Sequence, residues 1–86
     1  MANEHLIKHF GLRIRELREH KNISQEKLSF FTGFHRTYIG MIERGERNIS
    51  LTNMAVFAKV FELNISELLD FKTINFYKEY ETKIQK

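Results

Sequence analysis

Residues 24–45, SQEKLSFFTGFHRTYIGMIERG, decide the fold that we expect for this chain. The segment is typical of two short helices with a tight turn between them. Ser24 can cap the first helix, because a serine hydroxyl accepts a backbone N–H that has no partner inside the helix. The turn falls at Gly33, since glycine allows the positive φ that a sharp reversal needs. The second helix begins near His35, and Gly45 ends it as a left-handed residue.

The apolar residues of this segment are spaced so that they meet between the two helices. They are Leu28, Phe34, Ile39 and Ile42. Two helices joined by a glycine turn of this length are typical of a helix-turn-helix, whose second helix lies in the DNA major groove. The outer face of the second helix is left with Arg36, Thr37, Tyr38, Gly40, Met41 and Arg44. An ordinary helix pair with a solvated polar face is the alternative that the spacing alone leaves open.

The same segment resembles the helix-turn-helix of the Cro and repressor superfamily of lambdoid phages, the XRE-like regulators. The residues that carry the resemblance are Gln25, Leu28, Gly33, Ile39, Ile42, Glu43 and Gly45. It continues upstream through IRELRE (residues 14–19) and downstream to ISELL (residues 65–69), and so covers roughly residues 8–70. The runs HRTYI (residues 35–39) and IERGERNIS (residues 42–50) are similar to the small controller proteins of restriction–modification systems.

The resemblance implies an all-α fold, a five-helix DNA-binding domain of the lambda-repressor type, over residues 1–71. Residues 72–86 are then a C-terminal extension, where Phe76, Tyr80 and Ile84 recur every four residues. This spacing favours a sixth amphipathic helix that packs on a partner over a frayed basic tail. The resemblance further implies a cytoplasmic homodimer that regulates transcription from a palindromic operator, an inverted repeat in double-stranded DNA. Such a protein controls its own promoter within a restriction–modification system.

Two other functions stay open. A phage-type repressor would use the same domain on DNA. An antitoxin-type module, whose main task is to mask a toxin and whose DNA binding is secondary, belongs to a different class. The sequence shows no long extension of the kind that wraps a toxin, which disfavours the antitoxin.

The DNA-contacting residues follow from the motif and from side-chain chemistry. Base edges are expected to be read by Arg36, Thr37, Tyr38 and Met41. An arginine at the position of Arg36 can bond O6 and N7 of one guanine, which is worth roughly 1–3 kcal/mol of discrimination. Phosphates are expected to be bound by Gln25, Arg44, Arg47 and Asn48. The start of a helix attracts phosphate through its unpaired N–H groups, and in the family the loop after the second helix follows the DNA backbone. A solvated loop is the alternative for Arg47 and Asn48.

The resemblance also implies two structural contacts. Arg18 falls where the superfamily has an arginine paired with the glutamate that Glu43 matches, so this pair would tie the first helix to the recognition helix. The family's homodimer contact lies at the positions of Ile65, Leu68, Leu69 and Phe71. These residues exceed what one short helix needs to cover a small core.

The remaining helices are predicted from apolar spacing and capping residues. A first helix over residues 4–22 would bury Leu6, Phe10, Ile14 and Leu17. Ser50 can cap a helix that would bury Leu51, Met54, Phe57, Ala58 and Phe61. Asn64 and Glu67 predict a capping box at the start of a helix over residues 65–70. Glu62 stands where the family usually has a helix-ending glycine, so it would lengthen or strain the end of the preceding helix.

Composition bounds the class of protein. Of 86 residues, 42% are hydrophobic and 29% are charged, as in a single soluble globular domain. Proline is absent and there are four glycines, which favours helices. The chain has no cysteine, hence no disulfide and no thiolate metal site. No apolar run approaches the ~18 residues of a membrane span, and no signal peptide is apparent.

Charge and residue chemistry favour a nucleic-acid partner over catalysis. Residues 1–48 carry nine Lys and Arg against six Glu, whereas residues 49–71 carry one Lys against three acidic residues. Such an asymmetric charge distribution suits a protein that places one basic face against the phosphates of a nucleic acid. We find no nucleophile beside a base, no paired carboxylates and no phosphate-binding glycine loop, so we expect no enzyme, no cofactor and no small-molecule ligand. His5 and His9 lie four residues apart without a third ligand, so solvated histidines are favoured over a metal site.

Overall fold

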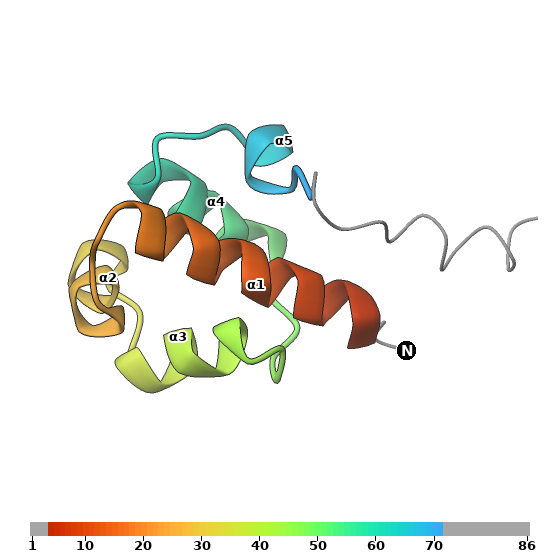
Figure 1. Cartoon of the computed structure of the whole chain (residues 1–86), viewed down its shortest axis with the longest axis horizontal. Coiled ribbons are helices and arrows are strands. Elements are labelled where there is room, and N and C mark those ends of the chain that lie inside the picture. Colours follow the sequence, from red (N-terminus) through yellow and green to blue (C-terminus); the bar gives the residue numbers. More distant parts are fainter. Residues whose placement is uncertain (1–3, 72–86) are drawn as a thin grey trace, which may run out of the picture.

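The computed structural model describes residues 4–71, and this part of the chain is all α-helical, as predicted. Its five helices are α1 (Glu4–His20), α2 (Gln25–Thr32), α3 (Arg36–Glu43), α4 (Leu51–Val60) and α5 (Ile65–Leu68). In Figure 1, α1 crosses the centre of the domain, with α3 on one side of it and α4 and α5 on the other. The predicted sixth helix lies outside the described residues.

The helices begin where side chains satisfy their first N–H groups. Ser24 and Ser50 each accept the N–H three residues further on, at 3.0 and 3.1 Å, which confirms both predicted caps. Asn64 and Glu67 form the predicted capping box, with both reciprocal bonds present. His35 caps α3 through Nδ1, which accepts a backbone N–H at 3.1 Å; the sequence analysis did not foresee this cap.

Four helices end on a residue with left-handed backbone: Asn22 (φ 59°) after α1, Gly33 (φ 79°) after α2, Gly45 (φ 73°) after α3 and Glu62 (φ 59°) after α4. After α1, α3 and α4, the next residue bonds back to the carbonyl five positions earlier, as Leu63 N–H does to Ala58 O at 2.8 Å. Glu62 therefore strains the end of α4 instead of lengthening the helix.

Two predicted helix ends were placed too late. The first helix stops at His20, not at residue 22, because the chain reverses through the left-handed Asn22. The last helix stops at Leu68, not at residue 70.

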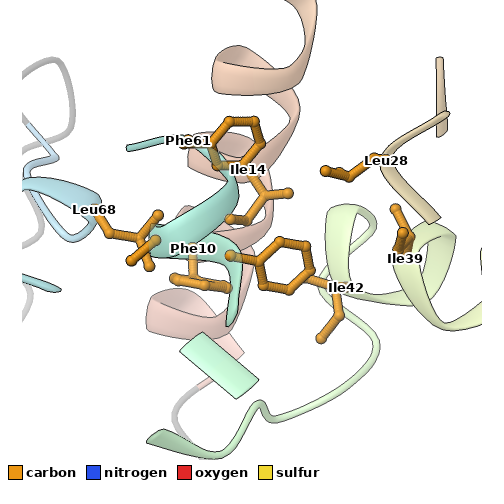
Figure 2. Packing of buried hydrophobic residues seen from close by; sticks show 9 residues of the cluster. Phe10, Ile14, Leu28, Ile39, Ile42, Phe61 and Leu68 are labelled. Carbon is orange, nitrogen blue, oxygen red and sulfur yellow. The ribbon is translucent and has the colours of Figure 1, made fainter. Parts of the chain in front are cut away.

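The core lies where α1, α4 and α5 meet α2 and α3 (Figure 2). It consists of Phe10, Ile14, Leu28, Ile39, Ile42, Phe57, Ala58, Phe61 and Leu68. Phe34, Leu17 and Met54 are partly buried against it. Two residues predicted in the core are largely exposed, Leu6 at 37% and Leu51 at 66%. Both stand in the first turn of a helix, α1 and α4 respectively.

Gly11 explains how closely α1 and α3 approach each other. A Cβ atom at this position would lie 2.7 Å from the Glu43 carbonyl oxygen and closer still to that of Ile42. From the sequence, Gly11 was expected only to interrupt the first helix, at a cost of about 1 kcal/mol relative to alanine. The structure shows that the missing side chain lets the middle of α1 rest on the backbone at the end of α3.

The strained end of α4 gives a first prediction. Replacing Glu62 by glycine should stabilise the domain by about 1 kcal/mol, because glycine adopts the left-handed conformation without a Cβ clash. Urea unfolding of both proteins measures the change. Asn22→Gly is the matched control: asparagine tolerates this conformation better, so its gain should be smaller. An equal gain at both positions, or none at Glu62, would contradict this account of strain.

Candidate nucleic-acid interface

A buried carboxylate joins the first three helices. Glu43, at the end of α3, accepts two bonds from the Arg18 guanidinium of α1, at 2.7 and 3.1 Å. Their side chains are only 3% and 13% exposed. The bond to Glu43 raises the pKa of Arg18, which also donates to the Ile23 carbonyl at 2.9 Å. The structure thus contains the pair suggested by the sequence, and it ties α1 to the end of α3.

Gln25 belongs to the same cluster. Its Nε2 donates to Glu43 Oε1 at 3.0 Å, so the first residue of α2 is held against the end of α3. The sequence suggested Gln25 as a phosphate contact. A glutamine amide has two N–H groups and an acceptor oxygen, so one bond fixes the side chain and leaves it capacity to bind elsewhere.

The outer face of α3 is narrower than predicted. Arg36 and Thr37 are exposed at its N-terminal end, whereas Tyr38 and Met41 are half-buried. Gly40, expected on the outer face, is buried. A Cβ atom there would lie 3.0 Å from Arg44 Nη1, so the guanidinium passes directly over the backbone of Gly40. Helical spacing places Gly40 near the outer stripe, but it cannot show that a long side chain from the next turn covers it.

Tyr38 is a junction between α3, α4 and the loop that joins them. Its ring meets Phe34 edge to face, with centroids 5.1 Å apart. Its hydroxyl accepts a hydrogen bond from Asn53 Nδ2 of α4 at 3.0 Å. The Arg47 guanidinium lies 5.3 Å from the ring centroid, in a cation–π arrangement. Tyr38 therefore supports Arg47 in the loop. Asn53 could not be assigned to this junction from the sequence, because its spacing from Tyr38 carries no local signal.

The loop after α3 gathers the predicted phosphate contacts. Arg44, Arg47 and Asn48 are all exposed there. Arg44 is paired with Glu46 through two bonds, Nε to Oε2 at 2.9 Å and Nη2 to Oε1 at 3.2 Å. These bonds raise the pKa of Arg44 and lower that of Glu46 from their ordinary values. Glu46 was not among the predicted site residues, although a glutamate two residues after an arginine, across a glycine expected to be left-handed, was a signal for this pair.

The predicted dimer residues differ in burial. Leu68 is fully buried, so its assignment to the interface is wrong; it is the inward residue of the four-residue α5. Leu69 is 36% exposed, while Ile65 and Phe71 are partly buried at the edge of the core. Arg13 of α1 fixes this region, since its guanidinium donates to two carbonyls at the end of α5, at 3.0 and 2.7 Å.

Among residues 4–71, no group of three His, Asp or Glu side chains could hold a metal ion. The rings of His5 and His9 lie 4.3 Å apart, edge to face. Within residues 4–71, no helix is long and apolar enough to cross a membrane.

The glycine turn between α2 and α3, the exposed start of α3 and the basic loop after it define a helix-turn-helix DNA-binding protein. The Helix-turn-helix family profile matches residues 14–68. Control protein C.BamHI of Bacillus amyloliquefaciens is 50% identical over 66 residues, which span 76% of this chain and 82% of that protein. Control protein C.SmaI of Serratia marcescens is 43% identical over 56 residues, 65% of this chain and 67% of that protein.

Two solved structures also resemble this chain. The restriction–modification controller protein C.AhdI from Aeromonas hydrophila is 48% identical and matches with a TM-score of 0.67, covering 73% of this chain and 90% of its own. A hypothetical transcription factor, NHTF from Neisseria, is 26% identical and matches with a TM-score of 0.71 over 95% and 91% of the two chains. The chain belongs to the helix-turn-helix family and, within it, is a homologue of the control proteins.

The buried cluster gives a second prediction. Glu43→Ala should lower the free energy of unfolding by about 3–5 kcal/mol, because the Arg18 guanidinium would stay buried without its carboxylate. Denaturant unfolding of Glu43→Ala, Arg18→Ala and the double variant measures the coupling, and simple additivity would contradict it. Glu19→Ala is the control: it breaks an exposed pair with Arg15 at 3.2 Å and should cost less than about 1 kcal/mol.

Proposed function

We propose that this protein regulates transcription as the control protein of a restriction–modification system. The observation that carries the proposal is its similarity to C.BamHI and C.AhdI, which extends through the helix-turn-helix and over most of their lengths. The exposed start of α3 supports it. Such a regulator acts in the cytoplasm on double-stranded DNA and carries out no reaction of its own.

On DNA, α3 lies in the major groove with its N-terminal end toward the base edges. Arg36 and Thr37 are exposed there and read bases. Tyr38 and Met41 are half-buried, so their share of base contact is limited to the atoms that remain accessible. Arg47, supported on the Tyr38 ring, reaches the phosphates together with Asn48, and these contacts fix the register of α3.

A homodimer is part of the proposal, because one recognition helix reads only a few base pairs. Leu69 and Phe71 line a mostly apolar cavity of about 400 Å³, whose walls also include Leu6 and the loop residues Arg47 and Asn48. Apolar surface of this kind suits a contact about a two-fold axis, and Ile65, partly buried at the edge of the core, is assigned to the same contact. Two copies of α3 would then lie about 34 Å apart, one turn of DNA, which requires an inverted-repeat operator. We place that operator upstream of the protein's own gene, where weak dimerisation makes occupancy rise steeply with concentration.

The base-reading role of α3 gives a third prediction. Arg36→Ala should weaken binding to the cognate duplex by roughly 1–3 kcal/mol and leave binding to random duplex almost unchanged. Arg47→Ala is the control: it should weaken both alike and lower the slope of log affinity against log salt by about one. Titration of both duplexes at several salt concentrations measures these effects. Equal loss on both duplexes would make Arg36 a phosphate contact.

The dimer gives a fourth prediction. Leu69→Glu should shift the protein toward monomer in sedimentation equilibrium at tens of micromolar, because a charge would be desolvated in the contact. Phe30→Glu, at a 78% exposed residue of α2, should leave the dimer intact. A monomeric wild-type protein would contradict the dimer. Footprinting that finds no protected inverted repeat at the protein's own promoter would contradict the operator.

A further inference from the structure

Arg44 and Glu46 flank Gly45 directly after α3. Two parallel bonds join the Arg44 guanidinium to the Glu46 carboxylate, at 2.9 and 3.2 Å. Both side chains remain open to water, at 58% and 49% exposure. The pair is therefore a surface contact that can exchange its partners without unfolding the domain.

The backbone fixes where this pair stands. Gly45 N–H donates to Ile42 O at 3.0 Å, and Glu46 N–H donates to Met41 O at 2.8 Å. Gly45 also packs against Lys8 of α1, since a Cβ atom on it would lie 3.0 Å from the Lys8 Cα. Glu46 is thus held beside Arg44 by the helix end.

The position of the guanidinium matters for DNA. Arg44 Nη1 passes over the backbone of Gly40, where a Cβ atom would lie 3.0 Å from it and 3.7 Å from Gln25 Oε1 at the start of α2. The start of α2 and the end of α3 are the two places from which phosphate contacts are proposed. A carboxylate and a phosphate engage the same parallel N–H groups of a guanidinium, so the Nε–Nη2 edge that Glu46 holds is closed to phosphate, and only the Nη1 side is left for other partners.

We propose that Glu46 competes with DNA phosphate for the Arg44 guanidinium and thereby lowers the affinity of the protein for every duplex. In the free protein Arg44 donates to Glu46; on DNA the same N–H groups donate to a phosphate, and Glu46 returns to water. Because every sequence presents phosphates, the effect is uniform over sequences. The inference rests on the proposed function, since it requires that the loop after α3 meets DNA.

Simple repulsion between Glu46 and phosphate would also weaken binding, and a double-mutant cycle separates the two mechanisms. Competition acts only through Arg44, so it disappears when Arg44 is removed. Repulsion acts through space and persists without Arg44.

The experiment measures the affinity of Glu46→Gln, Arg44→Ala and the double variant for a random-sequence duplex at low salt, with thermal unfolding to show that all are folded. Glu46→Gln should tighten binding about 2–5-fold, the range of an exposed ion pair. In the Arg44→Ala background, the same change should have no effect. Glu16→Gln is the matched control: Glu16 pairs with Arg13 at 3.5 Å where α1 meets α5, and its loss should leave the affinity unchanged.

Two results would overturn the inference but not the proposed function. In the first, the wild-type protein binds the duplex and Glu46→Gln does not bind it more tightly. In the second, Glu46→Gln tightens binding equally in the presence and absence of Arg44. A wild-type protein that binds no duplex would overturn the proposed function, and the inference with it.

Discussion

The geometry of the domain depends on one buried carboxylate. Glu43 accepts bonds from Arg18 of α1 and Gln25 of α2 while its own backbone ends α3. A charge removed from water in this way requires partners, so the arrangement that satisfies it is strongly preferred over looser packings. The core supplies most of the free energy through apolar burial, but apolar burial is not directional. The carboxylate adds direction, and so it specifies how the recognition helix is oriented.

The sequence predicted well those features that depend on neighbours in the chain. Ser24, Ser50 and the Asn64–Glu67 box all cap helices as expected, because capping is decided within four residues. The glycine turn at Gly33 likewise has the expected positive φ. The Arg18–Glu43 contact is not local, and only the family resemblance pointed to it.

What the sequence did not predict depends on tertiary packing. Helical periodicity gives the face of a residue but not what covers it, which is why Gly40 was expected outside and Leu51 inside. Tyr38 was treated as an outward base-reading side chain, whereas it also bonds to Asn53 on another helix. Leu68 was assigned to a dimer contact because apolar residues at a helix end look surplus until the core they fill is known.

The contact at Gly11 has a consequence for how such proteins diversify. The end of α3 rests on α1 through backbone carbonyls, so this contact is made by groups that every residue type shares. Arg36 and Thr37, at the other end of α3, take no part in that contact. Under the proposed function, substitutions there would change which bases are read without disturbing the contact that seats α3 on α1. The fold thus places the residues proposed to read DNA apart from those that hold the helix in position.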